Sequence, residues 1–216
     1  MGCRGGRIIT GYRHQKQLKY LVLIGASTGG PKALHYIFSH LTLRQDTALL
    51  VVQHMPPGFT RSLANRLNEL SAYTVKEAQQ GEAVQGAYAY VAPGDYHMEM
   101  KLTEGVPVIH LHQDAPQRGH RPSVDVLFRS AAQTVNYGVV TVILTGMGKD
   151  GTEGLQWLRE RKNVYSLAED QSTCVVYGMP KAASEARLID KVVPLEGMPG
   201  AIEQAIKELG GSGQWI

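Results

Sequence analysis

The strongest constraint on the fold is a repeated unit in which a short, β-rich apolar run precedes a helix-like segment. This unit occurs four times, at 18–41, 47–70, 139–162 and 188–209. Apolar runs without polar interruption are typical of strands buried on both faces, and a following helix returns the chain to a parallel neighbour. We therefore predict an α/β fold, a mostly parallel, doubly wound sheet with helices on both faces.

The middle of the chain departs from this unit. Around residues 73–112 lie four short strand-like pieces, AYTVKEA, AYAYVAP, HMEMKL and PVIHLH, separated by Gly, Pro and Asp. Such punctuation favours hairpins over another strand–helix–strand unit. We expect a β-hairpin region at one edge of the sheet.

Length and charge suggest one domain with short extensions. The 216 residues suit a single α/β domain, which we place at 17–209. Residues 1–16 are predicted to be a basic leader or linker remnant, because no Asp or Glu occurs before Asp46. Residues 210–216 are predicted to be a flexible tail.

Composition excludes several classes of protein. The net charge of +3 gives no sign of a nucleic-acid partner, and no apolar stretch is long enough to insert into a membrane. Cys3 and Cys174 form neither a disulfide framework nor a metal-binding spacing, which fits a reducing cytosol. We expect a cytoplasmic protein.

Three predicted strands end in residues that can carry chemistry. Ser27 follows the first, His54 the second, and Asp150 the strand at 139–145. The carboxyl ends of parallel strands meet at one edge of the sheet, where ligands bind. A serine, a histidine and an aspartate are therefore expected to converge there.

Ser27 lies in a turn with two interpretations. The glycines at 25 and 29 give G-x-S-x-G, the sharp strand-to-helix turn that exposes a nucleophile near helix N–H groups. Ser27 could instead simply cap the helix that follows, because serine is a favoured cap.

The loop that contains Asp150 also has two interpretations. Its glycines have the spacing of a dinucleotide-binding turn, at Gly146, Gly148 and Gly151. Glu169 and Asp170 follow about twenty residues later, as a ribose-binding acid should, so a NAD(P)-dependent oxidoreductase is one hypothesis. In the other, the Asp150 carboxylate orients His54 within a catalytic triad. Spacing alone leaves both open.

A metal site is a weaker hypothesis. His110 and His112 share one face of a predicted strand, with Asp114 and His120 nearby. The sequence has no further ligand signature, and we do not expect a metal at these residues.

Five motifs together resemble one family. They are IGASTGGP at 24–31, QHMPPGFTRSLANRL at 53–67, HRPSVDVLFRSAA at 120–132, LTGMGKDG at 144–151 and GMPKAASEARLIDKVVPL at 178–195. In this order they resemble the catalytic domain of the chemotaxis protein-glutamate methylesterase, CheB, over most of residues 20–205. Under this resemblance, the domain at 17–209 is a methylesterase catalytic domain.

The resemblance implies roles for particular residues. Ser27 would be the nucleophile, His54 the general base and Asp150 the carboxylate that orients it. The backbone N–H groups of Thr28 and Met147 would form the oxyanion hole.

A further segment of the resemblance borders the expected cleft. There His120 and Arg121 would contact the substrate. Ser123 could equally cap the helix that begins after it.

The resemblance also implies a function, which is hydrolysis of glutamyl methyl esters on the cytoplasmic helices of methyl-accepting chemotaxis receptors. It further implies deamidation of particular receptor glutamines, with no metal or cofactor. The remaining alternative is a catalytically silent receptor-binding module.

Family members commonly carry a receiver domain before the catalytic domain, and 26 residues before Ser27 are too few for one. We therefore expect an excised catalytic domain or a free-standing esterase, with any receiver domain acting in cis from a missing segment or in trans.

Overall fold

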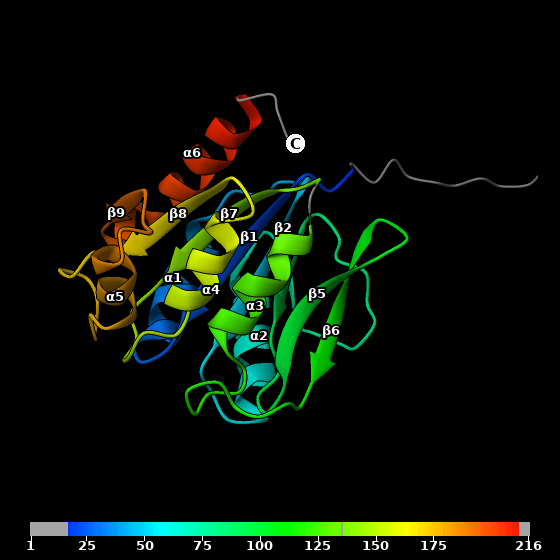
Figure 1. The fold of residues 1–216 in the computed structure, drawn as a ribbon, viewed down its shortest axis with the longest axis horizontal. Coiled ribbons are helices and arrows are strands. Elements are labelled where there is room, and N and C mark those ends of the chain that lie inside the picture. Colours follow the sequence, from blue (N-terminus) through cyan, green and yellow to red (C-terminus); the bar gives the residue numbers. More distant parts are fainter. Residues whose placement is uncertain (1–16, 135, 212–216) are drawn as a thin grey trace, which may run out of the picture.

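The computed structural model describes residues 17–134 and 136–211 (Figure 1). The strands are β1 Tyr20–Ala26, β2 Thr47–Gln53, β3 Thr74–Glu77, β4 Tyr88–Val91, β5 His97–Thr103, β6 Val106–His112, β7 Gly138–Ile143, β8 Val164–Glu169 and β9 Lys191–Val193. The α-helices are α1 Gly30–His40, α2 Phe59–Leu70, α3 Val124–Ser130, α4 Thr152–Arg159, α5 Met179–Glu185 and α6 Met198–Gly211, with short 3-10 helices at Ala131–Gln133 and Leu195–Gly197.

Seven of these strands form one sheet, in the order β3-β4-β2-β1-β7-β8-β9. Every neighbouring pair is parallel. The chain starts at the centre with β1, builds one half of the sheet, and then crosses to β7 to build the other half. The predicted doubly wound α/β fold is confirmed.

The middle of the chain differs from the prediction in part. HMEMKL and PVIHLH form the antiparallel hairpin β5–β6, a separate two-stranded sheet (Figure 1). AYTVKEA and AYAYVAP do not form hairpins, because β3 and β4 are parallel and extend the main sheet. The connection between them is tied to the hairpin, since the Val84 N–H donates to the Pro107 carbonyl and the Ile109 N–H to the Glu82 carbonyl.

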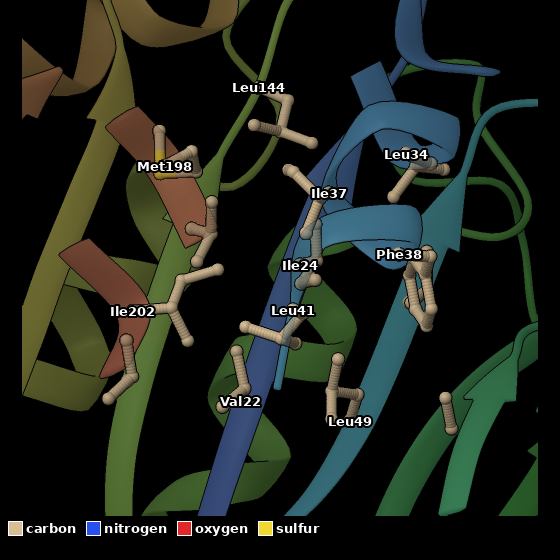
Figure 2. Packing of buried hydrophobic residues seen from close by; sticks show 14 of the residues in the cluster. Val22, Ile24, Leu34, Ile37, Phe38, Leu41, Leu49, Leu144, Met198 and Ile202 are labelled. Atoms are coloured by element: carbon tan, nitrogen blue, oxygen red, sulfur yellow. The ribbon is translucent and has the colours of Figure 1, made fainter. Parts of the chain in front are cut away.

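Helices cover both faces of the sheet because side chains alternate along its strands. Val22 and Ile24 of β1 face a core shared with α1, α2 and α6. Figure 2 shows Ile37 of α1 and Ile202 of α6 in this layer. Leu21 and Leu23 face the opposite layer, formed by α3, α4, α5 and one side of the β5–β6 hairpin.

The approach of α3 to the end of β1 depends on Gly25. A Cβ at this position would lie 2.4 Å from a methyl carbon of Val124, the first residue of α3. Any larger side chain would push the helix away. Glycine therefore lets the beginning of α3 lie directly against the carboxyl edge of the sheet.

The expected terminal segments fall mostly outside the described residues. The predicted leader at 1–16 lies outside them, as does the part of the predicted tail at 212–216. Helix α6 includes Gly210 and Gly211, so the last helix is longer than predicted. Within 17–134 and 136–211, no helix is both long and apolar enough to cross a bilayer.

Candidate active site

Ser27 lies at the end of the central strand, between the turns that follow its two neighbours. Its N–H donates to the Thr145 carbonyl at 3.0 Å, which continues the pairing of β1 with β7. On the other side, the His54 N–H donates to the Ala26 carbonyl at 3.1 Å. The half-buried Ser27 is thus held by backbone hydrogen bonds at the topological switch point of the sheet, where ligands bind in such folds.

Gln53 joins the Ser27 and His54 turns. Its buried side-chain amide donates to the Ser27 carbonyl at 2.9 Å and to the His54 carbonyl at 3.1 Å. Ser27 and His54 line one cavity of about 400 Å³, which Phe59 borders with an exposed ring. The two predicted residues therefore share one open space.

Asp150 binds the imidazole of His54. The distance from His54 Nε2 to Asp150 Oδ2 is 2.7 Å, and both side chains are nearly buried, with exposures of 7% and 1%. Since the carboxylate takes Nε2, the other nitrogen, Nδ1, is left without this partner. Nδ1 is buried and has no hydrogen-bond partner within the described part of the chain.

The Asp150 carboxylate also accepts hydrogen bonds from the beginning of α3. The Val124 N–H donates to Oδ2 at 2.7 Å and the Asp125 N–H to Oδ1 at 3.0 Å. The Ser123 hydroxyl donates to Oδ1 at 2.9 Å and makes no capping bond to its own helix. Asp150 thus accepts from the first N–H groups of α3, and the alternative in which the Ser123 side chain caps this helix is not found.

These contacts set the charge of Asp150. Burial alone would raise its pKa, but the hydrogen bonds from His54 and from the α3 N–H groups outweigh burial and lower this pKa to about 2. Asp125 behaves oppositely, because burial and the neighbouring Asp150 charge raise its pKa to about 6. One carboxylate is therefore kept ionised while its neighbour holds a proton more readily.

The predicted oxyanion donors, the N–H groups of Thr28 and Met147, lie in the two turns next to Ser27. The Thr145 hydroxyl connects these turns by donating to the Thr28 carbonyl at 2.9 Å. A Cβ at Gly146 would lie 2.7 Å from the Ser27 Cβ, so only glycine permits this approach. Neither predicted donor has an intramolecular acceptor among the residues described.

The side chains of His120 and Arg121 make different contacts. The His120 ring stacks on the His54 ring, with centroids 3.8 Å apart and an interplanar angle of 8°. The Arg121 guanidinium binds the Asp95 carboxylate and two backbone carbonyls. His120 therefore joins the predicted site directly, whereas the charge of Arg121 is engaged within the protein.

The residues expected to bind a dinucleotide have other partners. Glu169 is fully buried, and its carboxylate accepts from the Thr145 N–H at 2.8 Å and from the Thr173 hydroxyl at 3.1 Å. Asp170 accepts from the N–H and hydroxyl of Ser172. Both acids of the dinucleotide hypothesis therefore accept hydrogen bonds from groups within the protein.

The histidines of the hairpin do not join His120. His110 stacks on His112, and His112 Nδ1 lies 3.1 Å from an Asp114 carboxylate oxygen. Among residues 17–134 and 136–211, no group of three or more His, Cys, Asp or Glu is arranged to hold a metal ion.

Sequence reasoning missed two residues of this site. Gln53 stands next to His54 in the sequence, but its bridge to the Ser27 carbonyl depends on how β1 and β2 pair. Asp125 received no role within the motif at 120–132, yet its Oδ1 accepts from the Gly151 and Gly154 N–H groups. An acid in the first turn of the helix, between Val124 and Val126, was the available signal.

A hydroxyl, an imidazole and a buried carboxylate in this order can support nucleophilic acyl transfer. Free backbone N–H groups beside the hydroxyl can stabilise an oxyanion.

Comparison with known proteins gives one consistent result. The profile of the CheB methylesterase family matches residues 22–202. The protein-glutamate methylesterase/protein-glutamine glutaminase of Halalkalibacterium halodurans is 49% identical over 189 residues, covering 88% of this chain and 54% of the relative. The protein of the same name from Pyrococcus abyssi is 45% identical over 192 residues, covering 89% and 52%.

The fold matches a solved structure of the same kind. The Thermotoga maritima CheB methylesterase catalytic domain superimposes with a TM-score of 0.81 at 41% identity, covering 88% of this chain and 98% of that one. The chain spans about half the length of the curated relatives it matches, and nearly the whole of this solved catalytic domain.

Proposed function

The chain belongs to the CheB methylesterase family, and on that premise we propose that it hydrolyses methyl esters of glutamate side chains through Ser27, His54 and Asp150. Its substrates would be the cytoplasmic helices of methyl-accepting chemotaxis receptors, where it would also deamidate particular glutamines. In this proposal the protein acts in chemotaxis adaptation in the cytoplasm.

The first half of the reaction acylates the enzyme. His54 Nδ1 takes the proton of the Ser27 hydroxyl while Oγ attacks the ester carbonyl carbon. The N–H groups of Thr28 and Met147 donate to the oxyanion of the tetrahedral intermediate. When the intermediate collapses, Nδ1 returns the proton to the departing methoxide, and methanol leaves.

The second half releases the product. His54 Nδ1 takes a proton from water, and the hydroxide attacks the acyl carbonyl. Collapse of this intermediate returns the proton to Ser27 Oγ and releases the glutamic acid side chain, which gives its remaining proton to solvent and becomes a carboxylate. With a glutamine substrate, ammonia leaves in place of methanol and the other steps are the same.

Asp150 makes this sequence efficient by holding one tautomer. Its carboxylate accepts the Nε2 proton at 2.7 Å, so the lone pair of the neutral ring is on Nδ1, the atom that takes the Ser27 proton in this proposal. Asp150 stays ionised at neutral pH because its pKa is about 2, and it therefore stabilises the imidazolium formed in each half. This contact is the observation that carries the proposal.

Methanol release from methylated receptor fragments tests the proposal. We expect Ser27→Ala to lose at least 10³-fold in kcat, an order of magnitude taken from serine triads. Thr42→Ala, at the opposite edge of the sheet, is the matched control. If Ser27→Ala kept the wild-type rate, Ser27 would not be the nucleophile.

Two further measurements separate the alternatives. Labelling of Ser27 by a fluorophosphonate would rule out a catalytically silent receptor-binding module, since such labelling requires an activated serine. Tight, saturable binding of NAD(P) in a thermal-shift titration would instead favour an oxidoreductase.

Regulation by a receiver domain is part of the proposal, because the relatives are about twice as long as the matched region. Adding an isolated receiver domain in trans and measuring methanol release would test it.

A further inference from the structure

The proposed base is covered on one face by a second imidazole. The His120 and His54 rings lie 3.8 Å apart and are nearly parallel, at 8°. His120 comes from the loop between β6 and α3, whereas His54 follows β2. The proposed reaction steps do not use this second ring.

We propose that His120 is a positioning residue, whose flat ring holds the His54 imidazole in the plane that joins Asp150 to Ser27. This inference rests on the proposed function for the identity of the base. It goes beyond that function by giving His120 a task other than substrate contact.

The loop is built to hold His120 in place. Gln117 and His120 exchange two backbone hydrogen bonds, of 3.0 and 2.8 Å, across a tight turn. Both central residues, Arg118 and Gly119, have positive φ, as a type I′ turn requires. The turn therefore fixes the direction in which His120 leaves the backbone.

The turn is also attached to the helices around Asp150. The Arg118 guanidinium pairs with Glu153 of α4 and lies 3.7 Å from the Asp125 carboxylate of α3. The His120 ring is therefore held relative to the same elements that hold the carboxylate.

Stacking constrains the rotation that matters for catalysis. His54 has one freely rotating bond between Cβ and the ring, and turning about it moves the ring edge out of its plane. A parallel ring at 3.8 Å blocks this movement on one side. Nε2 then stays within 2.7 Å of Asp150, and Nδ1 keeps its direction.

The charge of His120 suits this task. Burial, and next the adjacent His54, lower the pKa of His120, while Asp150 acts in the opposite direction. The stacked ring is therefore neutral at pH 7 and does not repel the imidazolium that His54 becomes.

Three substitutions test separately the flat ring of His120, its nitrogens and its volume. His120→Phe keeps a flat ring without nitrogens, His120→Leu keeps apolar volume without a ring, and His120→Ala removes both. His40→Ala is the matched control, because it removes an imidazole stacked on Tyr36 at the far end of α1.

Two readouts are needed. One is kcat and KM for methanol release from methylated receptor fragments. The other is the rate at which a fluorophosphonate labels Ser27, which depends on the base whatever ester the enzyme accepts. We expect His120→Ala and His120→Leu to lower kcat and the labelling rate about 10- to 100-fold with little change in KM. We expect His120→Phe to stay within a few-fold of wild type.

Wild-type rates in His120→Ala or His120→Leu would overturn the proposal. So would a His120→Phe variant as slow as His120→Leu, since the nitrogens would then be required. If His120→Ala fails to fold, the comparison of Phe with Leu decides by the same criteria.

Failure of the proposed function looks different, because the wild type would then label at Ser27 but release no methanol. In that case the labelling rates alone still decide the role of His120.

Discussion

Replacing Asp150 with asparagine tests the proposed site most directly. The Asp150 carboxylate accepts five hydrogen bonds, three at Oδ1 and two at Oδ2. An asparagine has only one acceptor oxygen, so at least two of these donors lose their acceptor whichever way the amide is turned. If the amide NH₂ faces His54, Nε2 must become the acceptor, and the proton moves to Nδ1. The base then cannot take the Ser27 proton.

The cost in stability follows from the pKa. Folding lowers the pKa of Asp150 from 3.8 to about 2, which corresponds to about 2 to 3 kcal/mol of stability at neutral pH. Because the folded-state pKa is the lower one, this stability is present above about pH 4 and is lost as the pH falls towards 2. Loss of two buried acceptors gives about the same figure from the same contacts, so the two do not add.

Two assays check the two consequences of D150N. We expect kcat for methanol release to fall about 10⁴-fold, the order found when a triad aspartate becomes asparagine. Urea unfolding should show a loss of about 2 to 3 kcal/mol at pH 7 that shrinks as the pH approaches 3. Asp114→Asn is the matched control, since its side chain is 82% exposed.

A D150N variant within tenfold of the wild-type kcat would refute the assignment of Asp150. An equal loss of stability at pH 3 and pH 7 would refute the argument from its charge.

Three further outcomes follow from the same contacts. G25A should lower stability by about 1 to 3 kcal/mol in urea unfolding and reduce kcat, because its Cβ would meet Val124; unchanged kcat would show that the position of α3 is unimportant. Q53M removes two buried hydrogen bonds between turns, so we expect about 1 to 3 kcal/mol of lost stability and a lower kcat. A loss of stability with an unchanged kcat would contradict the bridging role. The folded-state pKa of Asp125 is raised to about 6. Its contribution to the free energy of unfolding is therefore full below pH 4 and is lost as the pH rises through 6. D125N should therefore flatten the curve of unfolding free energy against pH between pH 4 and 6, as measured by urea unfolding. An unaltered curve would mean that Asp125 does not titrate in this range.

The sequence predicted those parts of the fold that depend on local pattern. Uninterrupted apolar runs such as TALLVVQ became buried parallel strands, and the second strand has the expected bounds, Thr47–Gln53. The pattern failed at β3 and β4, where Gly and Pro marked the ends of short strands but not their direction. Direction depends on pairing with β2, which lies outside the local sequence.

The candidate site, too, could be predicted from the sequence only in part. That Ser27, His54 and Asp150 gather at one edge follows from the geometry of a parallel sheet. Which nitrogen of His54 faces the carboxylate does not, because this depends on the approach of two loops. The stacking of His120 depends likewise on a turn whose position relative to β2 no motif describes.

The hydrogen bonds that α3 gives to Asp150 have a consequence for mutational tolerance. Two of the donors are main-chain N–H groups, at Val124 and Asp125. A side-chain substitution cannot delete a main-chain N–H unless the new residue is proline. Scanning mutagenesis by alanine would therefore pass over these donors, and a proline scan of residues 124 and 125 is the experiment that would reveal them.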